Sequence, residues 1–229
     1  MITAALCWYD EPLGNLARLV LSLEGIASNL VALDGRWNLM PGDNTNSHDE
    51  QADEIYACCQ SIGLPLALYR VERPWDSQVA KRGALMHIAA RVGRQPWTLV
   101  IDADEYATSP DPQALHHHLG RSELDVATVL GRREGTGMRT GERPIRRLYR
   151  AATDVQVTVA HNGYRTADGR WLHGDSAFVN LQPAQDLHDL LTITNHVNSR
   201  SGSRNRAALD YRTARADTRI ERWPRGLKR

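Results

Sequence analysis

The sequence predicts an α/β fold, a single Rossmann-like domain with a mostly parallel central sheet flanked by helices. Three observations support this prediction. Strand-like apolar runs alternate with helical patterns over residues 2–101, as in successive βαβ units. A chain of 229 residues with 41% hydrophobic and 24% charged residues is large and balanced enough for one globular core. The apolar run 97–101 ends abruptly in carboxylates, at the kind of strand end where open α/β sheets bind ligands.

Turn and cap signals divide this region into elements. The expected strands are residues 2–8, 27–33, 64–71 and 97–101, and the expected helices follow Pro12, Ser47 and Ser77. Gly25 and Gly63 are expected to end the first two helices, and a polar loop over residues 36–46 precedes the second. Ser47 and Glu50 match a capping box, which predicts that Ser47 caps this second helix.

Carboxylates gather at one edge of the predicted sheet, because strand carboxyl ends and helix amino ends of βα units lie together. Asp10, Asp34, Asp102 and Asp104 all follow predicted strands. In an extended backbone Asp102 and Asp104 point the same way, and a divalent cation relieves their repulsion. Mn²⁺ or Mg²⁺ commonly bridges one or two carboxylates and substrate phosphates. The pattern therefore predicts a metal–diphosphate site, with simple helix capping or re-entry into solvent as the alternative.

Lys81 is expected near the same edge. It begins the apolar stripe of the helix that follows Ser77, in a chain whose basic residues are almost all arginines. An ammonium group there suits a diphosphate. The alternative is a surface lysine whose stem covers apolar neighbours.

Apolar runs, the N-terminal residues and the cysteines indicate where in the cell the protein is expected. No apolar run approaches the roughly 18 residues that a membrane-spanning helix needs, and the N-terminal residues lack the basic leader of a signal peptide. Three cysteines, Cys7, Cys58 and Cys59, have neither a disulfide framework nor metal-binding spacing. We therefore expect a cytoplasmic protein.

Basic residues concentrate in two segments. Residues 131–150 carry a net charge of +5 and residues 200–229 a net charge of +7, within a chain of net charge +1. Such segments suit a partner that bears phosphates, or else form a solvated arginine-rich helix and tail. Glycines within residues 131–141 favour a mobile basic loop, which we interpret as a lid.

Four short motifs carry a family resemblance. Trp8-Tyr9-Asp10-Glu11, Ala32-Leu33-Asp34-Gly35-Arg36, Lys81-Arg82-Gly83-Ala84-Leu85 and Asp102-Ala103-Asp104 occur in this order within residues 1–110. Together they resemble nucleotide-sugar glycosyltransferases of the GT-A fold, family-two-like enzymes of bacteria and phages. The resemblance implies a nucleotide-sugar and metal-binding half over residues 1–110, an acceptor-side half over 111–215 and a basic tail over 216–229.

The resemblance also implies roles for individual residues. Donor-binding residues would be Tyr9, Asp10, Asp34, Lys81, Arg82, Asp102, Arg200 and Arg204. Metal ligands would be Asp102, Asp104 and His196, since these enzymes often place a late histidine on the metal. The family's usual acidic motif late in the core has no clean match, which leaves Asp175 and His161 as the candidate catalytic bases.

The resemblance implies a metal-dependent glycosyltransferase that uses Mn²⁺ or Mg²⁺ and a nucleotide-sugar donor, with a UDP-sugar expected. Its acceptor would be modified DNA, a protein or a glycan. Two other classes stay open, a sugar-phosphate nucleotidyltransferase and a non-catalytic module that binds nucleotides or nucleic acid. The first of these requires a glycine-rich basic loop after the first strand, which residues 8–11 do not provide.

Overall fold

The structure is a computed structural model that describes residues 1–229 except 39, 41, 135–140, 160–162, 174–180 and 197–229. Its helices are α1 (Leu13–Leu21), α2 (Asp49–Ser61), α3 (Gln78–Val92) and α4 (Pro112–Arg121). Its strands are β1 (Ile2–Cys7), β2 (Asn29–Leu33), β3 (Leu66–Tyr69), β4 (Trp97–Asp102), β5 (Glu105–Thr108), β6 (Val126–Glu134), β7 (Glu142–Arg150), β8 (Val155–Val159), β9 (Gly163–Thr166), β10 (Trp171–His173), β11 (Gln185–Asp186) and β12 (Thr192–His196).

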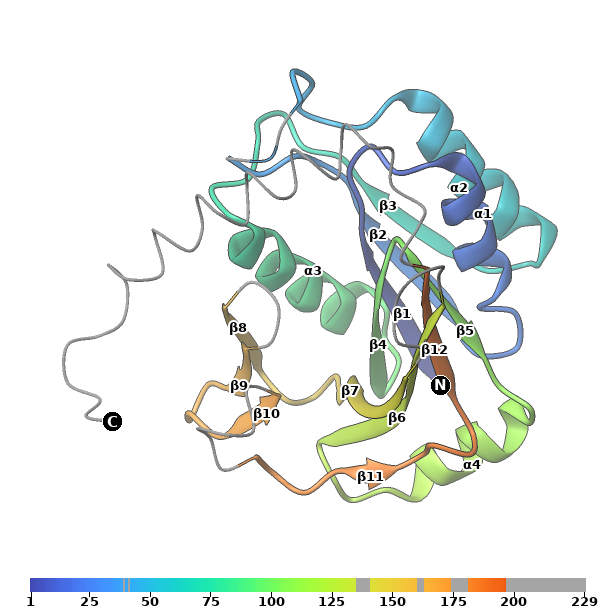
Figure 1. Cartoon of the computed structure of the whole chain (residues 1–229). Coiled ribbons are helices and arrows are strands. Elements are labelled where there is room, and N and C mark those ends of the chain that lie inside the picture. The colour runs from blue at the N-terminus through green and yellow to red at the C-terminus, as the bar shows by residue number, and fades with distance from the viewer. Residues whose placement is uncertain (39, 41, 135–140, 160–162, 174–180, 197–229) are drawn as a thin grey trace.

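The main sheet is mixed and mostly parallel, with the order β3-β2-β1-β4-β7-β6-β12-β5 and β11 beside β6. β7 is antiparallel to both of its neighbours, and β5 is antiparallel to β12. A second sheet of β8, β9 and β10 packs beside α3 (Figure 1). The predicted α/β class, with a mostly parallel sheet flanked by helices, is confirmed. The division at residue 110 stays a prediction, and the main sheet includes strands from both sides of it.

The sheet curls at the β4–β5 connection. β4 and β5 are separated by three strands in the sheet order, yet only residues 103 and 104 join them along the chain. The strands β7, β6 and β12 must therefore curve round so that β5 returns to the end of β4 (Figure 1). This curvature encloses side chains that point inward from β4, β5 and β7.

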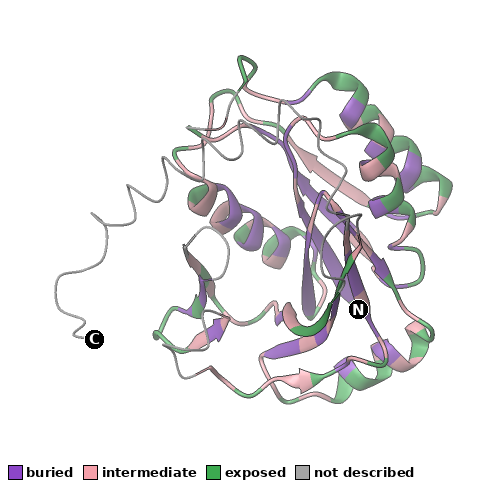
Figure 2. Cartoon of the chain, in the orientation of Figure 1, coloured by how far each residue is buried: buried purple, intermediate pink, exposed green. Residues whose placement is uncertain are grey.

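Strand β1 is buried on both faces, as a central strand of a parallel sheet requires (Figure 2). Alternate residues Ile2, Ala4 and Leu6 pack against α1 and α2, whereas Ala5 packs with α3. Neither side of the strand faces solvent, and its polar residue Thr3 is buried as well. Among the described residues, none of the helices combines the length and the apolar character that crossing a bilayer requires.

Two local expectations are wrong. Ser47 does not cap α2: the helix begins at Asp49 after His48, with no side-chain cap, and Ser47 bonds to other parts of the chain. Residues 131–134 do not belong to the expected basic loop, because they extend β6, which pairs with β7 in antiparallel register. Residues 135–140 of that loop lie outside the described residues. Gly131 lies within β6, where Ile145 of the paired strand fills the space that a side chain would need.

Leu99 tests the contribution of the central strand to stability. It is completely buried in β4, so Leu99→Ala leaves a cavity and is expected to lower the free energy of unfolding by about 2–5 kcal/mol. Leu21→Ala is the control, because that side chain is 44% exposed at the end of α1 and the expected loss is below about 1 kcal/mol. Urea unfolding measures both, and equal losses would contradict the assignment of β4 to the core.

Candidate functional site

The candidate site lies at the carboxyl edge of the parallel strands. β1, β2, β4 and β12 run in the same direction, so the residues after Cys7 and Leu33, together with Asp102 and His196, reach one edge of the sheet. Carboxyl ends of parallel strands are where open α/β sheets bind ligands. The sheet topology thus brings together the ends of β1, β2 and β4, which carry three of the four sequence motifs.

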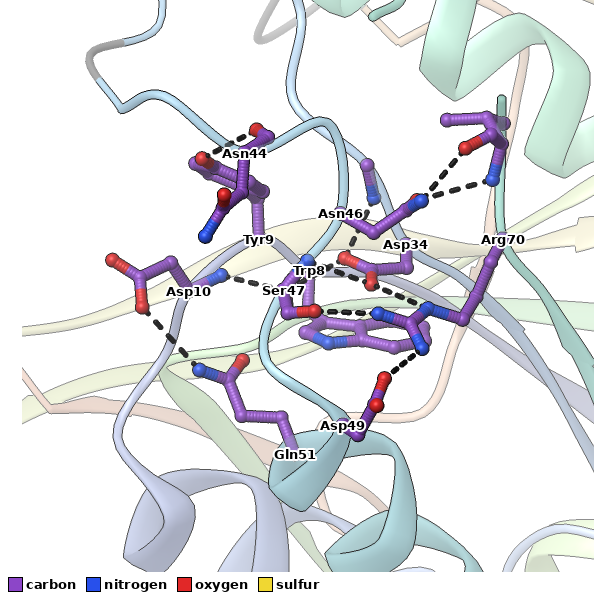
Figure 3. A network of polar contacts seen from close by, with 12 residues as sticks. Trp8, Tyr9, Asp10, Asp34, Asn44, Asn46, Ser47, Asp49, Gln51 and Arg70 are labelled. Carbon is purple, nitrogen blue, oxygen red and sulfur yellow. Dashed lines mark hydrogen bonds and ion pairs between the residues drawn. The ribbon is translucent and has the colours of Figure 1, made fainter. Parts of the chain in front are cut away.

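Asp34 anchors the loop that follows β2 (Figure 3). Its side chain is 0% exposed. Oδ1 accepts hydrogen bonds from the Gly35 N–H at 2.6 Å and the Ser47 hydroxyl at 2.7 Å, while Oδ2 accepts one from the Ser47 N–H at 2.9 Å. Arg70 Nε lies 3.4 Å from Oδ2. Four contacts occupy the carboxylate, so a direct contact with a donor, which stays a prediction, would require the loss of one.

The residues after β1 are tied to the same loop. Asp10 adopts a left-handed backbone with φ of 49°, which is uncommon outside glycine, and its N–H donates to Ser47 Oγ at 2.8 Å. Gln51 Nε2 lies 3.4 Å from Oδ1 of Asp10 (Figure 3). The buried Tyr9 donates its hydroxyl hydrogen to the carbonyl of Asn44 at 2.9 Å. Contacts from both strand exits therefore fix this half of the edge in one arrangement.

Lys81 lies beneath the strand ends. Its side chain is 1% exposed, and Nζ donates to the carbonyls of Trp8 and Gly35, both at 2.6 Å. Burial lowers the pKa of Lys81. The expected position near the edge is correct, but the alternative of a lysine at the surface is wrong. In this arrangement the ammonium group links the ends of β1 and β2.

Asp102 faces two arginines. Its Oδ1 pairs with Arg82 of α3, and its Oδ2 lies 3.5 Å from Nη1 of Arg147 on β7. Residues 103 and 104 form a turn, so the expectation of an extended backbone between Asp102 and Asp104 is wrong. The two carboxylates of the motif therefore occupy different environments.

Glu105 completes a buried network around this turn. It is 6% exposed, pairs with Arg147, and accepts a hydrogen bond from the Asp102 N–H at 3.0 Å through Oε2. Burial raises the pKa of Glu105 to about 7, against the opposing effect of Arg147. Burial works to lower the pKa of Arg147, but the carboxylates of Glu105 and Asp102 outweigh it and raise that pKa. Two guanidinium groups and two carboxyl groups thus share one small volume.

An aromatic stack joins the network to the second sheet. Arg82 Nη1 donates to the Tyr164 hydroxyl at 3.2 Å. The Tyr164 ring stacks on Tyr149 at 4.9 Å and on His173 at 5.8 Å between ring centroids. Burial lowers the pKa of His173 to about 4, and the nearby Arg147 adds to this. His173 is therefore neutral at pH 7.

The described residues do not form a complete protein cage for a metal ion, so the expected cation site stays a prediction. Among them no group of three or more histidine, cysteine, aspartate or glutamate side chains converges as a metal cage would. Mg²⁺ usually takes one or two carboxylates and completes its shell with water and substrate phosphates. Asp104 lies half-buried in the turn at the sheet edge and suits that mode. In register, Asn195 pairs with Glu105, which brings the backbone of His196 beside the turn.

The remaining candidates cannot be placed in the site. His161, Asp175, Arg200 and Arg204 lie outside the described residues, as does the side chain of His196. Conversely, the structure adds Glu105, Arg147, Tyr164 and His173, which the residue-by-residue reading did not assign to the site. Glu105 directly follows the Asp102-Ala103-Asp104 motif, but the partners of Arg147 and Tyr164 are distant along the chain, so no local pattern indicates those two residues.

No protein-family model and no curated protein matches the sequence. Among solved structures, S. aureus TarS 1–349 in complex with UDP-GlcNAc matches at 14% identity and a TM-score of 0.44, over 66% of this chain and 45% of that chain. A putative glucose-1-phosphate thymidylyltransferase from Bacillus anthracis, in complex with sucrose, matches at 7% identity and a TM-score of 0.45, over 67% and 73% of the two chains. The matched region spans just under half of TarS 1–349. At these TM-scores the site assignment rests on the geometry of this chain alone.

Asp34 is expected to stabilise the edge of the sheet. Asp34→Ala leaves the buried N–H groups of Gly35 and Ser47 without their acceptor and is expected to lower the free energy of unfolding by about 1–3 kcal/mol. Asp49→Ala is the matched control, because Asp49 pairs with the same Arg70 but is 83% exposed, and its loss is expected to be clearly smaller than that of Asp34→Ala. Urea unfolding compares the two, and similar losses would contradict the anchoring role.

His173 predicts a pH dependence of stability. Its folded pKa of about 4 lies below the ordinary value of 6.5, so the unfolded chain binds more protons between these values. Stability from this residue is therefore complete above pH 6.5 and falls as the pH drops toward 4. Thermal unfolding across this range is expected to show a shallower pH dependence for His173→Gln. The control is His87→Gln, an exposed residue of α3, and an equal change there would contradict the assignment.

Proposed function

We propose that this chain is a metal-dependent glycosyltransferase that transfers a sugar from a nucleotide-sugar donor, a UDP-sugar, to an acceptor. The observation that carries the proposal is the position of the Asp102–Glu105 turn at the carboxyl edge of four parallel strands. That is where an α/β sheet binds nucleotides. The ordered motifs at the ends of β1, β2 and β4 and at the start of α3 support the same donor edge.

In this proposal the chain's own residues prepare the donor site before any ligand binds. The ends of β1 and β2 would receive the base and ribose, with Tyr9 and Asp10 closest and Asp34 holding their loop. Asp104 and His196 would hold Mn²⁺ or Mg²⁺ against the diphosphate, where a cation neutralises the charge that develops on the leaving group. Arg200 and Arg204 stay predicted diphosphate contacts, and Asp175 and His161 stay the candidate bases. The acceptor stays a prediction between modified DNA, a protein and a glycan.

Binding of UDP tests the proposal. Wild-type affinity for UDP, measured by calorimetry, is expected to be higher with Mn²⁺ than with EDTA. Asp104→Ala is expected to remove this Mn²⁺-dependent gain, which means that UDP affinity in Mn²⁺ falls by at least about 100-fold. Residues that only orient metal ligands contribute about 10–100-fold, and a direct metal ligand is expected to contribute no less. His196→Ala is expected to reduce the gain without removing it, since one ligand of several is lost.

Asp189→Ala is the control, because Asp189 is exposed and precedes β12 at the opposite edge of the sheet. It should bind UDP as the wild type does. Equal UDP affinity with Mn²⁺ and with EDTA in the wild type would contradict metal dependence.

Slow release of UDP from one UDP-sugar would support sugar transfer, whereas exchange that depends on pyrophosphate would indicate a nucleotidyltransferase instead.

A further inference from the structure

Two guanidinium groups contact the residues around the β4–β5 turn, one from the buried Arg82 and one from the partly buried Arg147. Arg82 reaches Oδ1 of Asp102 from α3, and Arg147 reaches Oδ2 from β7 at 3.5 Å. Arg147 also pairs with Glu105 at the start of β5. One arginine therefore joins the residue before the turn to the residue after it.

These ion pairs oppose any movement of the Asp102 side chain toward the edge of the sheet. A buried guanidinium that loses its carboxylate is left as an uncompensated charge in the interior. If Asp102 turned to bind a cation directly, it would leave Arg82 and part of Arg147 in that state. Asp104 lies within the turn itself and is more exposed than Glu105.

We propose that Arg82 and Arg147 are positioning residues, which fix Asp102 and Glu105 so that the turn presents Asp104 as the carboxylate that binds the donor's cation. This inference rests on the proposed function. It separates the two acids of the motif, because Asp102 acts through its arginine partners and Asp104 acts on the ligand. It also differs from the expectation that Arg82 approaches the diphosphate.

Tyr164 extends the arrangement into the second sheet. Its hydroxyl accepts a hydrogen bond from Arg82 Nη1 at 3.2 Å, and its ring stacks with those of Tyr149 and His173. A guanidinium held at both ends keeps one orientation, which gives Asp102 a fixed partner. Arg82 of α3 therefore joins the β8–β10 sheet to the network around the turn.

Arg147→Met tests the proposal with two measurements. The gain in UDP affinity from Mn²⁺ is expected to fall by about 10–100-fold, as for residues that orient metal ligands, while the affinity in EDTA stays unchanged. Amide hydrogen exchange at residues 102–105 is expected to accelerate, because the acceptor of the Asp102 N–H loses its anchor. Arg147→Lys keeps the charge without the forked geometry and is expected to give intermediate values in both, including where Arg147→Met does not fold.

Arg150→Met is the matched control on the same strand. Arg150 lies over the Trp97 ring at 4.8 Å and bonds to the carbonyls of Ser122 and Leu124, far from the turn. It is expected to lower stability and to leave both the Mn²⁺ gain and the exchange at 102–105 unchanged.

Two results would overturn the inference. One is wild-type behaviour of Arg147→Met and Arg147→Lys in both measurements. The other is an Asp102→Asn variant that loses the Mn²⁺ gain as completely as Asp104→Ala while exchange at 102–105 stays normal, since Asp102 would then bind the cation itself. Absence of any Mn²⁺ gain in the wild type would refute the proposed function instead, and the exchange measurement would still decide whether the arginines position the turn.

Discussion

Charge compensation inside the curled part of the sheet is the constraint on which the rest of the structure depends. Arg82, Asp102, Glu105 and Arg147 come from α3, β4, β5 and β7, and all are largely buried. Removing one member of such a network leaves an uncompensated buried charge, at a cost of about 3–5 kcal/mol. The four elements therefore have one favourable arrangement, in which the turn at residues 103–104 brings β5 back to the end of β4. The curvature of β7, β6 and β12 follows from that requirement.

The other half of the edge depends on the hydrogen bonds of two buried charged groups, Lys81 and Asp34. Lys81 satisfies the carbonyls after β1 and β2 from below, while Asp34 satisfies the N–H groups of the following loop. The two side chains thus tie the ends of β1 and β2 to α3 and to the following loop. A ligand at this edge thus meets a surface that is already ordered, which reduces the entropy that binding would otherwise cost.

The sequence predicts the first half of the fold well, because its signals there are local. Strands β1, β2 and β4 and helix α3 lie within a few residues of their expected bounds, and Ser77 caps α3 as its position indicates. The sequence does not predict the β6–β7 pair, because glycines and arginines interrupt the alternation of apolar and polar residues that indicates a strand. Ser47 failed as a cap because Asp34, distant in sequence, competes for its hydroxyl. Local pattern could place Asp102 at a strand end, but Arg147 is 42 residues from Glu105, and only the curled sheet brings them together.

The two acids of the Asp102-Ala103-Asp104 motif are not equivalent in the structure. In an extended strand, residues two apart share a face, and symmetry between Asp102 and Asp104 would be expected. The turn removes that symmetry, because β4 continues up to Asp102 and directs it toward α3, whereas Asp104 belongs to the connection. Burial then increases the difference, since Asp102 balances two guanidinium groups that have few other partners. The acid nearest the core thus pairs with two arginines, whereas the acid in the turn lies in the connection between the strands, and this difference is the ground on which we propose separate roles for the two acids.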